Sequence, residues 1–109
     1  MPDQSIFPRE QRAQHRIHGV FPVRVRGVTS GGQPFETHTL ADNISSGGLY
    51  LQLPRLLPHG ARLFTLTRLP GGARLAARGR VLRAESKEHE LSGLAVRFSR
   101  SRLLPRAAT

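Results

Sequence analysis

Residues 21–26 read Phe-Pro-Val-Arg-Val-Arg, a run in which apolar and charged side chains alternate. Successive side chains of a β-strand point to opposite sides, so Phe21, Val23 and Val25 share one face and the arginines the other. Such alternation is typical of a strand that is buried on one side and exposed to water on the other. The segment therefore predicts β-structure at the start of the folded part of the chain.

Five further segments continue this pattern, and Gly, Pro and other turn-forming residues separate them. They span residues 35–40, 49–53, 63–67, 75–84 and 94–98. Six short strands with turns between them are typical of an antiparallel barrel or sandwich, and closure removes the exposed strand edges. We therefore predict an all-β fold, a six-stranded antiparallel small barrel.

The two ends of the chain are predicted to lie outside this barrel. Residues 1–18 are polar and show no helical stripe, so we interpret them as a flexible basic N-terminal arm. The barrel is expected to span residues 19–99 and a basic tail residues 100–109. Little or no C-terminal helix is expected, because Pro105 follows directly after Leu103 and Leu104. A length of 109 residues fits one domain, 1–109.

The composition excludes several classes of protein. The chain has no cysteine, which rules out disulfides and thiolate metal sites and is compatible with a reducing cytoplasm. No apolar run approaches the roughly 20 residues of a membrane span, and the first residues lack the apolar stretch of a secretory signal. We therefore expect a cytoplasmic protein without membrane insertion.

The charge predicts an anionic partner. Lys and Arg number 17 against 7 acidic residues, so the formal net charge is +10, and 16 of the cations are arginine. Guanidinium groups bind phosphates and guanine edges in a forked geometry that an ammonium group cannot match. The excess is densest near the two ends, with +3 in residues 1–26 and +4 in residues 97–109. The terminal segments are therefore expected to meet the partner.

Two motifs stand at the positions where such a ligand could bind. Arg12 and Arg16 lie four residues apart just before the first strand, and paired guanidinium groups suit two phosphates or a guanine. Residues 43–48, Asn-Ile-Ser-Ser-Gly-Gly, follow the second strand. Asn and Ser in such a loop often bond their own backbone while glycines adopt positive φ, yet this loop is longer than a tight hairpin needs. The loop could therefore also bind a polar planar ligand.

Taken together, the two motifs resemble those of the PilZ domain, the bacterial receptor module for cyclic di-GMP. The resemblance covers roughly residues 8–99 and includes Arg12-xxx-Arg16, Asn43-x-Ser45-xx-Gly48 and the terminal segment 93–98, Gly-Leu-Ala-Val-Arg-Phe. It implies a PilZ-like split barrel that takes cyclic di-GMP as ligand, acts in second-messenger signalling and needs no other cofactor.

The resemblance also implies roles for particular residues. Arg12 and Arg16 would stack on guanine and grip its edges and the phosphates, while Asn43 and Ser45 would hydrogen-bond a guanine and Gly48 would allow close approach. Further residues next to these motifs could add to the site: Arg9, Gln11, Ser46, Gly47 and Arg97. The arm would order on binding and change the surface that meets a protein partner.

Two departures from the family pattern affect the expected ligand contacts. Gln11 stands where many members have another arginine, which leaves the ligand stoichiometry open, although Arg9 lies two positions earlier. Asn43 replaces the charged Asp of the motif, with Asp42 one position early. An amide accepts a hydrogen bond without charge assistance, so the contact to guanine is expected to be weaker.

Three other functions are alternatives to a cyclic di-GMP receptor. A PilZ-like adaptor that binds no ligand and acts by protein contact is one alternative. A small basic nucleic-acid-binding barrel is another, but alternation turns Phe21, Phe64 and Phe98 inward and leaves Tyr50 as the main exposed stacking residue. Catalysis is not expected, because the five histidines are scattered and no nucleophile elbow is present. His15 and His18 lie near metal-ligand spacing, but arginines beside them would repel a cation, so no metal is expected.

Overall fold

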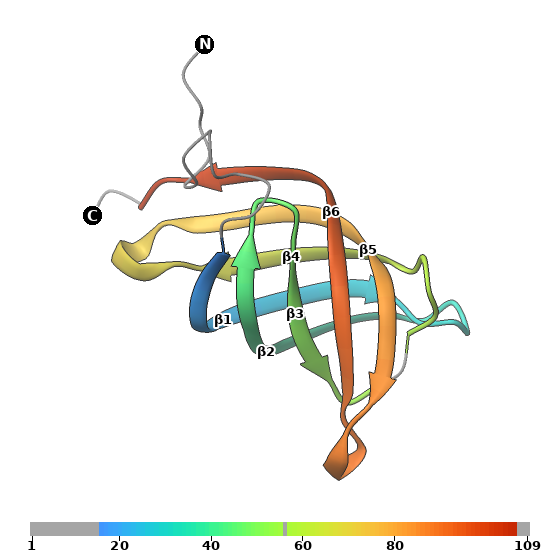
Figure 1. Cartoon of the computed structure of the whole chain (residues 1–109). Helices are drawn as coiled ribbons and strands as arrows, with labels where there is room; N and C mark the ends of the chain where they lie inside the picture. Colours follow the sequence, from blue (N-terminus) through green and yellow to red (C-terminus); the bar gives the residue numbers. More distant parts are fainter. Residues whose placement is uncertain (1–15, 56, 107–109) are drawn as a thin grey trace.

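The computed structural model describes residues 16–55 and 57–106, of which Arg16 and Ile17 by their backbone alone. This part of the chain is all-β (Figure 1). Its six strands are β1 (Arg16–Val28), β2 (Pro34–Ser45), β3 (Gly48–Leu53), β4 (Arg62–Arg68), β5 (Arg74–Ser86) and β6 (Ser92–Leu104). Two short 3₁₀ turns, η2 (Pro70–Gly72) and η3 (Glu88–Glu90), connect β4 to β5 and β5 to β6.

The strands close into a barrel in the order β1-β2-β3-β6-β5-β4, and β4 returns to pair with β1. Every pairing is antiparallel. Closure gives each strand a pairing partner on both sides, which removes the free edge strands of an open sheet. The long strands extend beyond their shorter neighbours, so residues 100–104 of β6, for example, pair with β5 alone. The predicted fold, a six-stranded antiparallel barrel, is confirmed.

Alternating apolar side chains fill the barrel. Phe21, Val23 and Val25 of β1 point inward as the opening stretch of sequence predicts, and each is at most 6% exposed. The inward residues of the other strands add mainly Leu, Val and Ala: Ala41, Leu49, Leu51, Leu53, Leu63, Leu75, Ala77, Val81, Leu94 and Val96. Burial of one of the larger side chains, such as valine or leucine, contributes roughly 1.5–3 kcal/mol. All of these residues except Ala77 belong to one continuous core.

β5 and β6 are long strands that bend together (Figure 1). Their register shifts between Arg78 and Gly79, where Arg78 pairs with Arg100 and Gly79 with Phe98, so Ser99 is an extra residue in β6. A bulge of this kind bends a strand and increases its local twist. Beyond the bend, the C-terminal part of β6 pairs with the N-terminal part of β5, and that part of β5 also pairs with β4.

The ends of the barrel differ from the expected boundaries. β1 begins at Arg16, so residues 16–18 belong to the sheet rather than to the arm. β6 continues to Leu104, so residues 100–104 are not a free tail. They are strand because residues 74–78 of β5 pair with them along their length, a long-range contact that local sequence does not reveal. Of the predicted tail, residues 105 and 106 follow the strand without regular structure and are exposed. Residues 1–15 of the arm and 107–109 of the tail lie outside the described residues.

The orientation of β4 also differs from the prediction. Phe64 was expected inside, but it lies opposite Arg26 of β1 and faces outward, while Thr65 and Thr67 are buried. Arg62 and Arg68 share the face of Phe64, because they are two and four residues away from it. Turning that face inward would bury two guanidinium groups, which costs far more than exposing one phenyl ring and burying two hydroxyls.

Candidate functional site

Backbone pairing brings the two sequence motifs together at one end of the barrel. Arg16 of β1 lies opposite Ser45 of β2, Ser45 lies opposite Gly48 of β3, and Gly48 lies opposite Arg97 of β6. Neighbouring strands of a sheet are about 4.8 Å apart, so four adjacent strands carry these four residues in one row. Figure 1 shows the β2–β3 turn at the same end of the barrel as the start of β1.

The turn between β2 and β3 is shorter than the sequence suggests. β2 extends to Ser45 and β3 starts at Gly48, which leaves only Ser46 and Gly47 between them. The Ser45 hydroxyl closes this turn: it donates to the carbonyl of Gly48 (3.4 Å) and accepts from the amide of Gly47 (3.2 Å). One acceptor lone pair of that oxygen remains for a ligand.

Gly48 is required by packing rather than by its backbone angles. The positive φ that glycines often adopt in turns is not found here, since Gly47 and Gly48 are not among the residues with positive φ. A Cβ on Gly48 would instead collide with the backbone carbonyl oxygen of Val96 on β6. The missing side chain therefore permits close contact between β3 and β6. Gly47 is different, because its Cβ would meet only Ser45 Oγ at 3.9 Å.

Asn43 lies at an irregular point where β2 bends. Its φ is +52°, in the left-handed region that Asn tolerates better than most residues, and the register shifts on both sides of it. His18 faces it from β1, and the Nδ1–H of His18 donates to Asn43 Oδ1 over 3.0 Å. The exposed amide group of Asn43 retains two N–H donors with which it could bind a nucleobase acceptor.

Cations outnumber acids around this end of the barrel. Arg97 is exposed and lies opposite Arg80 of β5 as well as Gly48, so a second guanidinium stands beside the row. Asp42 is the acidic residue adjacent to the motif, and it lies opposite Tyr50. Such a surface favours an anionic ligand over a cationic one.

A cluster of three polar side chains, Tyr50, Glu85 and Lys87, stands away from the row on the outside of β3 and β5. The Tyr50 hydroxyl donates to Glu85 (2.8 Å), and Lys87 forms an ion pair with the same carboxylate (3.2 Å). The bonds from Tyr50 and Lys87 lower the pKa of Glu85. Burial raises the pKa of Tyr50, and its bond to Glu85 adds to that effect. A Cβ on Gly93 would collide with this hydroxyl, so the absence of a side chain at Gly93 leaves room for Tyr50.

The predicted site residues divide into two groups. Asn43, Ser45, Ser46, Gly47, Gly48 and Arg97 are brought together with the backbone of Arg16 at this end of the barrel. Arg9, Gln11 and Arg12 lie outside the described residues. His18 is a neighbour of Asn43 that the sequence did not reveal, because the two are 25 residues apart and meet only through a bulged register.

Two structural features are absent from the part of the chain that the structure describes. Within residues 16–55 and 57–106, no group of three or more His, Asp or Glu side chains is placed to hold a metal ion. In the same part of the chain we find no helix with the length and apolar character to cross a membrane.

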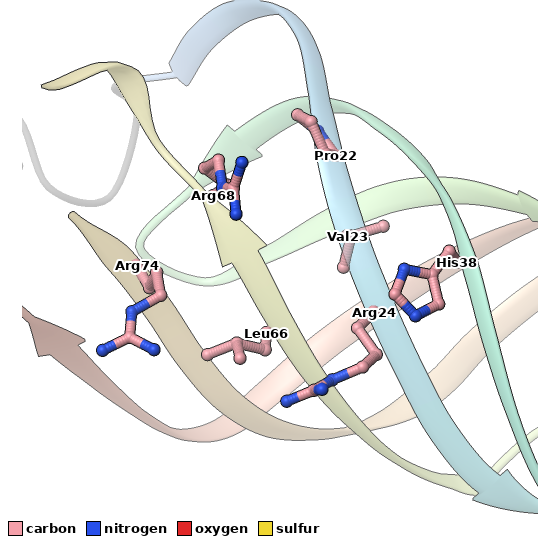
Figure 2. Close-up of a pocket in the computed structure, with 7 residues that line it drawn as sticks. All are labelled: Pro22, Val23, Arg24, His38, Leu66, Arg68 and Arg74. Carbon is pink, nitrogen blue, oxygen red and sulfur yellow. The ribbon is translucent and has the colours of Figure 1, made fainter. Parts of the chain in front are cut away.

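A pocket of about 360 Å³ lies elsewhere, on the outside of the barrel (Figure 2). Its walls come from β1, β2, β4 and β5 and include Arg24, His38, Leu66, Arg68 and Arg74. None of the predicted ligand residues lines it. The pocket is therefore a separate feature from the motif end.

Comparisons with known proteins agree with this fold. Residues 10–105 match the sequence profile of the PilZ domain. The structure is similar to the inhibitor of motility MotI/DgrA of Bacillus subtilis, with a TM-score of 0.65 and 25% identity over 92% of this chain and 48% of that one. It shares its fold with the PilZ domain of CeSA from a cellulose-synthesizing bacterium (TM-score 0.51, 22% identity, 76% and 80% covered). This chain spans about half the length of MotI/DgrA. No curated protein sequence is similar enough to count as a match.

Proposed function

Because the chain belongs to the PilZ domain family, we propose that it is a receptor for cyclic di-GMP that passes the presence of this ligand on to a protein partner. Binding would occur at the motif end of the barrel, without catalysis and without a further cofactor. Since the ligand is an intracellular second messenger, the proposed place of action is the cytoplasm.

One observation carries the proposal: the row formed by Arg16, Ser45, Gly48 and Arg97 across four adjacent strands. It joins residues that are up to 81 positions apart in sequence and belong to both family motifs. The closed turn at Ser45 and the close contact at Gly48 fix the backbone of this row before any ligand arrives. A preorganised site loses less entropy on binding than a flexible loop would.

The chemistry of the residues fits a guanine nucleotide. Arginine forms forked bonds to guanine O6 and N7, each worth roughly 1–3 kcal/mol of discrimination, and it also stacks on base faces. Arg12 and Arg16 would supply these contacts and hold the phosphates. Asn43 would donate from its amide, and Ser45 would accept through its remaining lone pair. Arg97 would add positive charge on the β6 side.

The signal to a partner would come from residues around Arg12. β1 anchors the backbone of Arg16, so a ligand held by both arginines would fix the preceding segment against the barrel. The surface near the motif end would then differ between the free and bound states. The structural neighbour MotI/DgrA is described as an inhibitor of motility, which is consistent with a regulatory role but does not name the partner of this chain.

Titration calorimetry with cyclic di-GMP tests this proposal, with GMP and cyclic di-AMP as control ligands. We expect saturable heat with cyclic di-GMP and none with the two control ligands. The stoichiometry would show how many ligands bind to a chain that has Gln11 in place of the arginine of many family members. Arg12→Ala and Arg16→Ala should abolish binding while the thermal unfolding transition stays nearly unchanged.

Arg24→Ala is the matched control, since Arg24 is an exposed arginine of the same strand outside the motif end. It removes the same charge and should leave the affinity within a factor of about three. If all three variants lost affinity equally, binding would depend only on the net charge of the protein. No heat from the folded wild-type protein would favour the ligand-free adaptor.

A further inference from the structure

Arginines face one another across the outside of the barrel. Three directly opposed pairs connect β4, β5 and β6: Arg62 with Arg80, Arg68 with Arg74, and Arg78 with Arg100. We call the outer surface that carries these six residues, together with the outward side of β1, the arginine face. Five of the six are exposed and Arg74 is partly exposed.

Opposed like charges weaken a sheet, and acidic residues do little to relieve the repulsion here. Arg26 of β1, at the edge of the face, has an ion pair with Glu36, and its 3.9 Å separation between exposed groups makes it weak. The other acids of the described chain lie elsewhere: Asp42 next to the motif turn, and Glu85, Glu88 and Glu90 around the β5–β6 connection. Within residues 16–55 and 57–106, the weak pair with Glu36 at the edge is therefore the compensation that the positive charge of the arginine face receives.

β4 adds apolar groups to the same surface. Phe64 and Leu66 face outward between Arg62 and Arg68. The inward positions carry Thr65 and Thr67 instead, whose buried hydroxyls have no hydrogen-bond partner in the structure. A strand with apolar groups outside and orphaned hydroxyls inside stabilises the barrel less than the reverse arrangement would. The outward side chains of β4 thus contribute little to the stability of the barrel and are available to bind a partner.

The outer pocket lies within this surface. Leu66 is opposite Arg24, and Arg68 is opposite Arg74, so an aliphatic side chain lies among three guanidinium groups. Figure 2 shows Arg24 and Arg74 on either side of Leu66, with His38 beyond Arg24. An occupant that fits this arrangement has an apolar group for the pocket floor and negative charges around it.

We propose that the arginine face binds an acidic protein segment in which carboxylates flank an apolar side chain that enters the pocket. Protein interfaces are enriched in arginine and aromatic residues and depleted in lysine, as this face is. A nucleic acid fits less well: its phosphate backbone offers no apolar group for Leu66, and the Phe64 ring lies under the Arg26 guanidinium (5.1 Å), which occupies a stacking face. The inference names the kind of partner that the proposed function requires, and in that respect it rests on that function.

Nuclear magnetic resonance titration of the ¹⁵N-labelled protein tests the inference, because it detects weak binding and locates it. The probe is a capped peptide Glu-Glu-Phe-Glu-Glu, and the comparison peptide has Ser in place of Phe. We expect the Phe peptide to shift amides around Leu66, Arg68 and Arg74, and to bind at least threefold more tightly than the Ser peptide. Arg74→Ala and Leu66→Ser should each weaken it roughly tenfold, which corresponds to about 1.4 kcal/mol.

Arg83→Ala is the matched control, since Arg83 is an exposed arginine of β5 that lies outside the face, near Glu85. It should leave the affinity for the peptide nearly unchanged. The inference is overturned if the two peptides bind equally, if all three variants weaken binding alike, if no shifts occur, or if a DNA duplex binds the same residues more tightly than the peptide.

Cyclic di-GMP calorimetry on the same proteins separates this inference from the proposed function. Arg74→Ala and Leu66→Ser should bind the nucleotide as the wild type does, because neither residue lies at the motif end. If the wild type binds the Phe peptide with the expected pattern but gives no heat with cyclic di-GMP, the receptor function fails while the acidic-segment surface stands.

Discussion

β3 and β4 are short strands of the same barrel that use their two faces in opposite ways. β3 buries Leu49, Leu51 and Leu53 and holds the motif turn at its start. β4 buries Thr65 and Thr67 beside Leu63 and turns its remaining apolar side chains outward among arginines. The interior of β3 therefore stabilises the fold around the proposed ligand site, whereas β4 gives up interior stability and presents an apolar and cationic exterior.

Truncating one leucine on each strand gives the largest expected contrast. Leu51→Ala removes a side chain with 0% exposure and should lower the free energy of unfolding by about 2–5 kcal/mol. Leu66→Ala removes the same atoms from a partly exposed, outward position, so a loss below about 1 kcal/mol is expected. Urea unfolding monitored by circular dichroism measures both. Similar losses would show that the outside of β4 contributes to folding as much as the inside of β3.

The two glycines of the motif turn give the next contrast. Gly48→Ala places a Cβ against the Val96 carbonyl and should cost about 1–3 kcal/mol, because the β3–β6 pairing must shift. Gly47→Ala, one residue away, adds a methyl group at an ordinary contact distance and should change stability by less than about 0.5 kcal/mol. Thermal unfolding of both variants checks this. A tolerated Gly48→Ala would mean that the glycine serves the ligand alone.

Much of the fold could be predicted from the sequence because one-sided burial leaves a period of two. The six strands and the inward positions of β1, β3 and the first half of β6 follow from it. The strand β4 was predicted, but its orientation was predicted wrongly because both of its faces contain apolar residues. Only the flanking Arg62 and Arg68, taken together, would have indicated which face is buried.

For the candidate site, the motifs were visible in the sequence but their geometry was not. Nothing local indicates that Arg16 lies opposite Ser45, or that Arg97 completes the row, because these contacts depend on register across four strands. The same holds for residues 100–104, which are strand only through their pairing with β5. The opposed arginines are equally invisible in sequence, since positions such as Arg78 and Arg100 become neighbours only in the barrel.

Filling the unfavourable interior of β4 should stabilise the protein. Thr67→Val replaces a buried hydroxyl that has no hydrogen-bond partner with a methyl group of similar size. We expect the free energy of unfolding to rise by about 1 kcal/mol, the lower end of the usual cost of an unsatisfied buried group. Ser45→Val is the contrasting change, because that hydroxyl has two bonds in the motif turn, and it should destabilise. A drop in the melting temperature of Thr67→Val would show that the hydroxyl is satisfied in solution.

Reversing one charge of an opposed pair should also stabilise. Arg100→Glu turns the repulsion with Arg78 into attraction, and a cross-strand pair of this kind contributes about 0.2–1 kcal/mol. Arg83→Glu is the control with the opposite expected sign, because it would place a carboxylate near Glu85. Melting temperatures at low and high salt measure both, and the gain of Arg100→Glu should shrink as salt screens the charges. A salt-independent gain would point to packing instead of charge.

The outward aromatic residues of the two strands provide the smallest and most specific test. Both rings lie near a cation, Phe64 of β4 near Arg26 and Tyr50 of β3 near Lys87. The Tyr50 hydroxyl also bonds Glu85 and, with Lys87, lowers the pKa of Glu85 in the folded protein. A carboxyl whose pKa is lowered by folding stabilises the protein at pH values above its unfolded pKa. That stability is lost as the pH falls through the folded pKa. Tyr50→Phe should therefore flatten the acid limb of the stability curve, while Phe64→Leu should leave its shape unchanged. In a Glu85→Gln background, Tyr50→Phe should no longer change the acid limb of the stability curve. Parallel stability curves for the wild type and Tyr50→Phe would contradict the role of Tyr50 in lowering the pKa of Glu85.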